Sequence, residues 1–321
     1  MPKISIIIPA YNYAHYISQS LDCLINQTFK DWECIIVDDG SLDNTKQVVE
    51  IYLNKDSRFK YYFKQNGGLS SARNFGIDRV VSKYVCFLDA DDILEPNFLF
   101  CSFYFLENLN KEAVVFQKFI KFFDDKSSDY LWYKDYNYNI GFQSNFFQRL
   151  VINNSLPPCS PMFPISIIKN NNFRFDETLT SYEDWDFWLK IAEKYPFYFI
   201  ENDNSAARVR FHSNSMSTNN WRMDINQLKV RLKLNNTLVN SNLISINYIG
   251  IESCVKTLLY SIADCLDNKE INNAKSKLLQ LIEIYPHKKI KILNKNFFYS
   301  HPKLFRKTSW ILWERIKNII K

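Results

Sequence analysis

The N-terminal part of the chain alternates between short apolar runs and longer amphipathic stretches, and this alternation constrains the fold more strongly than any other feature. The apolar runs are rich in β-branched residues, which predicts buried strands, whereas the amphipathic stretches predict helices. Strands that alternate with helices in this way are typical of an α/β sheet with crossover helices on its faces. The predicted strands span residues 3–9, 32–37, 59–63 and 84–88, and the predicted helices span residues 14–26, 45–53 and 69–81.

Polar residues follow the predicted strands at the point where each strand ends. In an α/β sheet these positions form the edge at which ligands bind. No GxGxxG follows the first strand, however, and no GxxxxGKS/T occurs in the sequence. The sequence therefore disfavours a dinucleotide-dependent dehydrogenase and a P-loop nucleotidase.

Three carboxylates follow the fourth predicted strand, at Asp89, Asp91 and Asp92. Carboxylates so close together repel one another unless a cation lies among them, and oxygen ligands suit Mg²⁺ or Mn²⁺. One interpretation is therefore a divalent cation that also binds a phosphate. The other is an acidic loop that caps the next helix, with Asp92 near its start and Pro96 in its first turn.

Composition restricts the setting of the protein. A net charge of +6 permits binding to nucleotides, anionic lipid or nucleic acid without selecting among them. The first two-thirds of the chain has no basic run with interleaved aromatic residues, so we expect no nucleic-acid partner. The seven cysteines form no CxxC pair, and no apolar run approaches the ~20 residues of a membrane-spanning helix. The apolar run 4–8 is too short for a signal-peptide core, so we expect a cytoplasmic protein with reduced thiols.

The second half of the sequence is less regular. Residues 124–145 show no clear period, which predicts a loop, and the Pro-rich residues 155–164 predict turns. From about residue 223 the sequence becomes helical and lacks clusters of catalytic type, which places a boundary near residue 220. Further strands are predicted at residues 113–116 and 207–212, with a helix at residues 181–194.

Six segments of the sequence belong together in one order: SIIIPAYN (5–12), CIIVDDGSLDNT (34–45), NGGLSSARNFGI (66–77), FLDADDIL (87–94), FDETLTSYEDWDFWLK (175–190) and RFHSNSMS (210–217). Taken together, these segments resemble the family 2 glycosyltransferases, which are inverting enzymes with a GT-A fold that use nucleotide sugars. The resemblance covers about residues 1–218 and implies a Rossmann-like mixed α/β sheet flanked by helices. We therefore expect a catalytic domain at residues 1–220 and an added helical region at residues 221–321.

The resemblance implies a donor site at the strand ends. A carboxylate can accept from a base N–H or a ribose hydroxyl, and an arginine can reach a phosphate oxygen. The residues alone leave other interpretations open, in which the two aspartates at 38 and 39 cap the next helix and the arginine at 73 lies on a solvated surface. The implied nucleotide-binding residues are Pro9, Ala10, Tyr11, Asp38, Asp39, Arg73, Asp89 and Ala90.

The resemblance also implies a metal site. Asp91 occupies the position that ligates the metal in a D-x-D motif, and Mn²⁺ or Mg²⁺ is the expected ion. His212 is a further candidate, because a neutral imidazole can bind a metal or contact a diphosphate. A structural histidine is the alternative.

A base must take the proton from the acceptor hydroxyl in an inverting transfer. The resemblance assigns this role to Asp184, with Glu183 beside it. The alternative is that both acids are helix N-terminal charges favoured by the helix dipole. Trp185 and Trp188 near them form either a surface that stacks on a sugar or part of the core.

The implied activity is transfer of a sugar from a nucleoside diphosphate sugar, expected to be UDP-linked, to a hydroxyl of a glycan or lipid-linked glycan. Bacterial surface polysaccharide or lipopolysaccharide assembly is the setting that the resemblance implies. The alternative is a catalytically inactive nucleotide-sugar-binding or regulatory protein of the same fold. Residues 301–321 are basic and amphipathic, which predicts peripheral contact with the inner face of the cell membrane or docking on protein.

Overall fold

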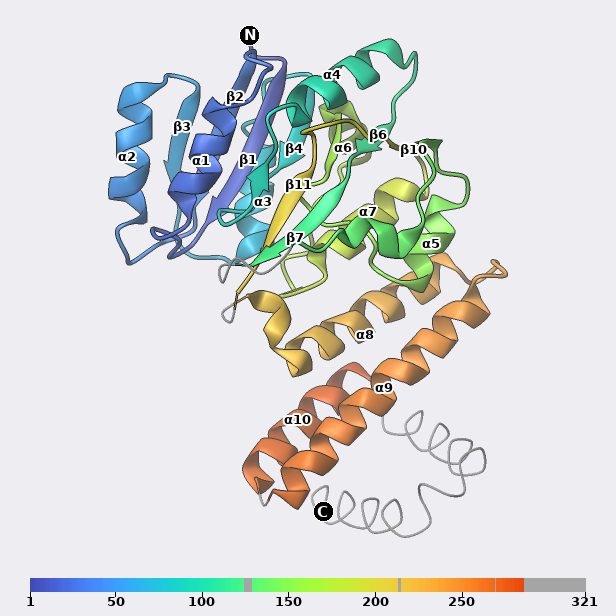
Figure 1. Cartoon of the computed structure of the whole chain (residues 1–321). Helices are drawn as coiled ribbons and strands as arrows, with labels where there is room; N and C mark the ends of the chain where they lie inside the picture. The colour runs from blue at the N-terminus through green and yellow to red at the C-terminus, as the bar shows by residue number, and fades with distance from the viewer. Residues whose placement is uncertain (124–128, 213–214, 269, 286–321) are drawn as a thin grey trace. The chain divides into compact units, whose positions relative to one another are not determined.

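The computed structural model describes residues 1–123, 129–212, 215–268 and 270–285. The chain divides into two compact units, and the division lies between Thr218 and Asn219 (Figure 1). The first unit contains the sheets, and the second is helical.

Eight of the strands in the described residues form one mixed sheet in the order β3-β2-β1-β4-β9-β6-β10-β8. The first four in that order are parallel, whereas β9 is antiparallel to both of its neighbours and β8 is antiparallel to β10. The predicted mixed α/β sheet is therefore confirmed. The strands are β1 (Ile4–Ala10), β2 (Trp32–Asp38), β3 (Phe59–Phe63), β4 (Tyr84–Phe87), β6 (Val114–Phe116), β8 (Gly141–Phe142), β9 (Pro161–Pro164) and β10 (Phe197–Phe199).

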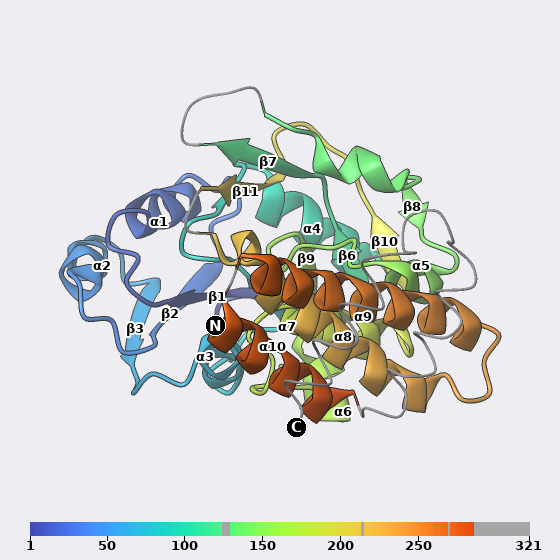
Figure 2. The same cartoon turned by 90° about the horizontal axis from the view of Figure 1, so that it is seen from below.

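Helices cover both faces of this sheet, with α1 and α4 on one side and α3 and α6 on the other (Figure 2). Strands β1 and β2 are buried along their whole length, as expected for strands of a sheet with helices on both faces. Helix α3 lies very close to β1, because a Cβ atom added at Gly76 would come within 2.5 Å of Ile7 Cγ2. The helices of this unit are α1 (Ile17–Ile25), α2 (Thr45–Lys55), α3 (Leu69–Ile77), α4 (Phe98–Asn108), α5 (Phe146–Ile152), α6 (Ile165–Asn171) and α7 (Glu183–Ala192).

The register of the parallel strands brings their carboxyl ends to one edge. Ala10 of β1 pairs with Asp38 of β2, which in turn pairs with Phe63 of β3. On the other side of β1, Ile7 pairs with Phe87, the last residue of β4. The polar residues that follow these strands consequently lie along the same edge of the sheet.

A second, three-stranded sheet adjoins the acidic segment that follows β4. Strand β11 (Ala207–Phe211) lies between β5 (Ile93–Leu94), to which it is antiparallel, and β7 (Phe119–Phe123), to which it is parallel. Because β5 begins directly after Asp92, this pairing brings the end of β11 next to the three aspartates.

The prediction of turns throughout residues 155–164 is wrong at its end, where β9 lies in the middle of the large sheet between β4 and β6. Proline is tolerated in a strand where no ladder N–H is needed, as at a strand end. Pro161 and Pro164 are the terminal residues of β9, so Met162 and Phe163 supply its interior positions. Proline residues usually indicate turns, but here two of them lie at the ends of a short, fully buried strand.

The prediction of a loop at residues 124–145 is also wrong in part. Within the described residues of this stretch, Trp132–Tyr136 form a 3₁₀ helix and Gly141–Phe142 form β8 at the end of the large sheet. Helix α7 begins at Glu183, two positions later than predicted.

The second unit consists of α8 (Asn220–Thr237), α9 (Ile244–Asp267) and α10 (Ile271–Ile284). The Asn219 side chain caps α8 by accepting a hydrogen bond from the backbone N–H of Arg222 at 3.0 Å. Buried residues of all three helices, among them Leu228, Leu258 and Leu281, form one hydrophobic cluster.

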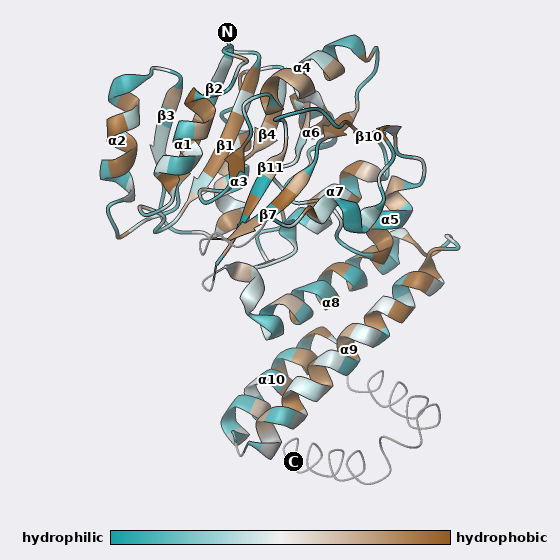
Figure 3. Ribbon diagram, in the orientation of Figure 1, coloured by the Kyte–Doolittle hydropathy of each residue, from teal (hydrophilic) through white to brown (hydrophobic). Residues whose placement is uncertain are grey.

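Apolar residues gather in the centre of the large sheet, whereas the helices carry mixed surfaces (Figure 3). Across the part of the chain that the structure describes, none of the helices combines the length and the apolar character that crossing a bilayer would require. The predicted membrane-contacting segment, residues 301–321, lies outside the described residues.

Candidate active site

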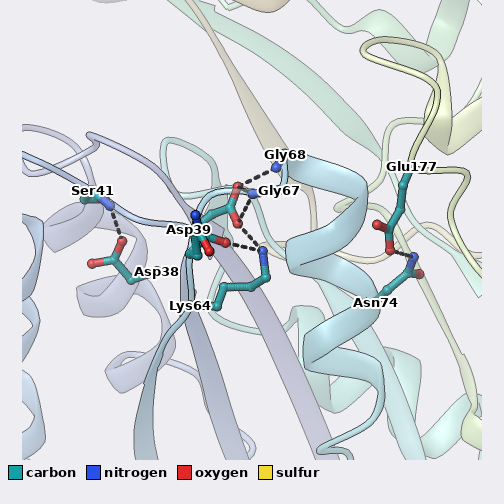
Figure 4. A network of polar contacts seen from close by, with 9 residues as sticks. Asp38, Asp39, Ser41, Lys64, Gly67, Gly68, Asn74 and Glu177 are labelled. Carbon is teal, nitrogen blue, oxygen red and sulfur yellow. Dashed lines mark hydrogen bonds and ion pairs between the residues drawn. The ribbon is translucent and has the colours of Figure 1, made fainter.

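Asp38 ends β2 at the edge where the carboxyl ends of the parallel strands meet, and its side chain is buried. Its Oδ1 accepts a hydrogen bond from the backbone N–H of Ser41 at 2.8 Å (Figure 4). Its Oδ2 accepts one from the Tyr61 hydroxyl at 2.6 Å. These partners belong to the following turn and to β3, so the alternative that Asp38 caps α2 is wrong.

Asp39 holds the turn that precedes α3 (Figure 4). Lys64 Nζ donates to Asp39 Oδ1 at 2.6 Å, and the backbone N–H groups of Gly67 and Gly68 donate to the same carboxylate at 3.0 and 2.7 Å. Gly68 has a φ of +90°, a conformation that favours glycine. An ionised carboxylate has about four acceptor positions, and these donors already use most of them. The helix-capping alternative is therefore also wrong for Asp39.

The end of β1 presents one exposed aromatic ring. Pro9 and Ala10 are buried in the strand, and the Ala10 carbonyl accepts from the backbone N–H of Asp39 at 2.8 Å. Tyr11, the next residue, is 44% exposed. The strand therefore places Tyr11 at the rim beside the aspartates, where its ring is available to a planar ligand.

Arg73 of α3 is fully buried and joins the two acidic motifs of the chain. Its Nη2 donates to Asp89 Oδ1 at 2.7 Å, and its Nη1 donates to Glu183 Oε1 at 2.7 Å. Burial alone would lower the pKa of this guanidinium, but the adjacent Asp89 and Glu183 carboxylates raise it. The alternative of a surface arginine is wrong, and the guanidinium is bound to two carboxylates that are 94 residues apart in the sequence.

The neighbouring residue of α3 supports this connection. The Asn74 side chain donates to Glu177 Oε1 at 3.0 Å (Figure 4). It also donates to the carbonyl of Phe175 at 3.0 Å and accepts from the backbone N–H of Phe175 at 2.9 Å. Helix α3 is thereby tied to the segment that leads into α7.

The acidic segment after β4 divides into residues with different partners. Ala90 and Asp92 are buried, and Asp92 Oδ1 accepts from the backbone N–H of Arg210 at 2.9 Å. Burial, together with the charge of Asp91, holds the pKa of the Asp92 carboxyl well above its usual value. Asp92 therefore joins the segment to β11, and the alternative that it caps the next helix is wrong.

Asp91 and His212 face each other across this edge. The distance from His212 Nε2 to Asp91 Oδ2 is 3.2 Å, and Arg210 Nε donates to the Asp91 carbonyl at 2.9 Å. Burial, and then the charge of Asp89, raises the pKa of the Asp91 carboxyl. The Asp89 charge contributes to this rise, and a cation bound at this position would favour the ionised form of Asp91.

The residues present fit a divalent cation that is shared with a ligand. Within the described ranges, no group of three or more His, Cys, Asp or Glu side chains forms a complete metal cage. One carboxylate and one imidazole, from Asp91 and His212, lie 3.2 Å apart at this edge. Mg²⁺ is commonly held in this way, by one or two carboxylates plus phosphate oxygens and water.

Asp184 lies on the first turn of α7 and is half-buried. Asn154 Nδ2 lies 3.3 Å from Asp184 Oδ1 and 3.2 Å from Oδ2, and the backbone N–H of Trp185 donates to Oδ1 at 2.7 Å. Burial, and then the charge of Glu183, raises the pKa of Asp184 to about 7. A carboxylate that titrates near neutral pH is suited to accept a proton from a hydroxyl.

The two tryptophans of α7 belong to the core. Trp185 and Trp188 are both fully buried, and Trp185 Nε1 donates to the carbonyl of Leu150 at 2.7 Å. The interpretation of these rings as a surface for a sugar is therefore wrong.

Two further residues contact the candidate site residues and were not predicted from the sequence, Lys64 at Asp39 and Asn154 at Asp184. Lys64 directly follows the last residue of β3, so its position at a parallel strand end was a usable signal. Asn154 follows α5 in an irregular segment, and nothing in the sequence connects it with Asp184.

Comparison with known proteins identifies residues 5–167 as glycosyl transferase family 2. This match spans just over half of the chain, and the chain therefore belongs to that family. It is similar to an uncharacterized glycosyltransferase of Rickettsia felis, with 30% identity over 213 residues that cover 66% of this chain and 35% of the relative. The chain thus spans about a third of the length of that relative.

Two solved structures share the fold. The S. aureus TarS 1–349 complex with UDP-GlcNAc superposes with a TM-score of 0.65 and 21% identity, covering 91% of this chain and 83% of that chain. The mannosyltransferase PcManGT from Pyrobaculum calidifontis, in complex with GDP-Man and Mn²⁺, gives a TM-score of 0.56 and 14% identity, covering 89% and 88%. At these identities the likeness establishes the fold, and the predicted GT-A fold is confirmed.

Proposed function

We propose that the protein transfers a sugar from a nucleoside diphosphate sugar to a hydroxyl group, with inversion at the anomeric carbon. The observation that carries this proposal is the Arg73 bridge, which binds Asp89 and Glu183 to one guanidinium. The bridge keeps the acids after β4 and the helix that bears Asp184 in one cluster. A donor and an acceptor bound on either side of this cluster would meet within reach of both.

The proposed donor site follows the edge of the sheet. Tyr11 stacks on the base, the carboxylates of Asp38 and Asp39 lie beside the nucleoside, and Asp89 contacts the ribose. Because Lys64 and the turn before α3 already use most acceptor positions of Asp39, the nucleoside would bind at the remaining position or replace one of these bonds. We favour a UDP-linked sugar, since the TarS structure, which shares the fold, is a complex with UDP-GlcNAc.

Asp184 is the proposed base. It takes the proton from the acceptor hydroxyl as that oxygen forms its bond to the anomeric carbon and the bond to the diphosphate breaks. Its pKa of about 7 allows it to be ionised before the attack and to hold the proton afterwards. Glu183 is held in place by Arg73 next to the base.

Asp91 and His212 are the proposed protein ligands of Mn²⁺ or Mg²⁺. When bound, the ion would supply positive charge to the departing diphosphate. Support for this choice comes from the 3.2 Å approach of His212 Nε2 to Asp91 Oδ2 and from the Mn²⁺ in the PcManGT complex.

For the biological setting we propose assembly of a bacterial surface glycan on a glycan or lipid-linked acceptor. The protein would then act in the cytoplasm or peripherally at the inner face of the membrane, through residues 301–321. We also propose that residues 1–220 carry out catalysis and that residues 221–321 bind the membrane or a partner protein.

A ligand screen tests the proposed donor site. We expect one of a set of UDP-, GDP- and dTDP-sugars, with Mn²⁺ present, to raise the melting temperature, because a ligand that binds only the folded state stabilises it. Asp91→Asn is expected to lose the Mn²⁺-dependent part of that increase. Equal increases for both proteins would contradict the metal role, and binding without turnover would support the inactive binding protein instead.

A further inference from the structure

Asn154 makes an unusual contact with the proposed base. It is half-buried in the segment between α5 and β9, and one amide nitrogen addresses both oxygens of Asp184, at 3.3 and 3.2 Å. A donor placed between the two oxygens restrains rotation of the carboxyl group, because a turn about the side-chain bond lengthens at least one contact.

The position of Asn154 is itself fixed by tyrosines from the preceding segment. The Tyr136 hydroxyl donates to the Asn154 carbonyl at 3.3 Å, and the Tyr138 hydroxyl donates to the Ser155 carbonyl at 2.7 Å. Arg149 Nη1 in turn donates to the Tyr136 carbonyl at 2.7 Å. These bonds hold the backbone of residues 154 and 155. The Asn154 side chain is restrained separately, because its Oδ1 accepts from the backbone N–H of Leu156 at 3.4 Å.

Two nearby charged residues have opposite effects on the ionisation of Asp184. Glu183 on the same helix disfavours a second negative charge, and Arg73 on α3 favours it. Arg149, the charged residue of α5, donates to the Tyr136 carbonyl. The Asn154 amide acts with Arg73, because its N–H groups can only donate and an ionised carboxylate can only accept.

We propose that Asn154 is a positioning residue for the base, which fixes the orientation of the Asp184 carboxylate and favours its ionised form. The packing of residues 136–156 then sets the fraction of protein in which the base can act. The assignment of Asp184 as the base rests on the proposed function, whereas the effect of Asn154 on its ionisation does not.

Unfolding in urea as a function of pH tests this effect without any ligand. The folded pKa of Asp184, about 7, lies above the value of about 3.9 expected in the unfolded chain. Between these two pH values the folded state binds more protons than the unfolded state, so the contribution of Asp184 to the free energy of unfolding falls as pH rises. Asn154→Ala should raise the folded pKa of Asp184 by about 1. The free energy of unfolding should then go on falling to a pH about one unit higher than in the wild-type protein.

The comparison is made between wild type and Asn154→Ala, and repeated in an Asp184→Asn background. A tenfold change in the proton affinity of Asp184 corresponds to a further decrease of about 1.4 kcal/mol in the free energy of unfolding as pH rises. This further decrease should vanish when residue 184 cannot titrate. A loss of stability that is equal at every pH, or that persists with Asp184→Asn, would overturn the proposal. Asn154→Asp, which adds a negative charge beside Asp184, should raise the pKa further than Asn154→Ala and serves if the alanine variant fails to fold.

A kinetic arm uses UDP release from UDP-GlcNAc with Mn²⁺ present. We expect the rising limb of the pH profile to move upward by about one pH unit in Asn154→Ala, with activity above the limb recovered to within a few-fold. The matched control is Asn153→Ala, since the Asn153 side chain is exposed, and its profile should not move. An unchanged limb in Asn154→Ala counts against the proposal. If the unfolding arm shows the expected pH dependence but no nucleotide sugar is turned over, the Asn154 proposal stands and the proposed function fails.

Discussion

Replacement of Arg73 by Met removes a buried cation from between two carboxylates while keeping most of the side-chain volume. The Arg73 side chain is 1% exposed, and those of Glu183 and Asp89 are 6% and 28% exposed. Removal of one partner from a buried ion pair costs about 3–5 kcal/mol, because the other charge remains uncompensated. Asp89 is nearer to solvent, where pairs contribute only about 0–1 kcal/mol.

We therefore expect Arg73→Met to lower the free energy of unfolding by about 4 kcal/mol, mostly through Glu183. This is a large part of the ~5–15 kcal/mol typical of a folded domain. The assay is urea unfolding at neutral pH, with comparison of the midpoints at a constant slope. Addition of Glu183→Gln should restore part of the loss, because the stranded charge is then absent.

Lys83→Met is the matched control. Lys83 Nζ also lies 2.7 Å from a carboxylate, that of Glu107, but these side chains are 60% and 39% exposed. The expected loss is at most about 1 kcal/mol. A loss for Arg73→Met as small as that of the control would refute the reasoning that the buried bridge holds the two acidic motifs together.

Two further predictions follow from particular contacts. Burial and the charge of Glu183 raise the pKa of Asp184 to about 7, and the base must be ionised to act. We therefore expect kcat/KM to rise with pH up to about 7 and to level off above it. A pH profile that does not rise between about 5 and 7 would contradict the role of Asp184. Gly76→Ala should lower the melting temperature, since the new Cβ would lie 2.5 Å from Ile7 Cγ2 and overpacking costs about 1–3 kcal/mol. A higher melting temperature, as helix propensity alone would give, would show that α3 moves away from β1 easily.

Much of the first unit could be predicted from sequence because its strands are parallel and covered on both faces. Such strands appear as continuous apolar runs, and the residues that follow them must meet at one edge. Strands β1 to β4 and the positions of Asp38 and Asp89 were predictable for this reason. Strand β9 was not, because two residues between two prolines carry no period and are recognised only when β4 and β6 lie on either side.

The partners of the site residues depended on contacts between distant segments. An arginine on an amphipathic helix is usually exposed, and Arg73 is buried only because Asp89 and Glu183 come together around it. Asn154 likewise contacts Asp184 only because α7 packs beside α5 in the folded chain. The residue types that bear chemistry could be identified from sequence, but their pairing required the fold.

The most direct test of the account compares Asp184→Asn with the wild-type protein in two assays on the same samples, donor binding and donor turnover. Asparagine keeps the shape of the side chain but cannot take a proton from a hydroxyl. We expect unchanged binding of the nucleotide sugar with Mn²⁺ and turnover reduced by ~10²–10⁴-fold. Turnover at the wild-type rate would contradict the assignment of Asp184 as the base and, with it, the proposed mechanism of glycosyl transfer.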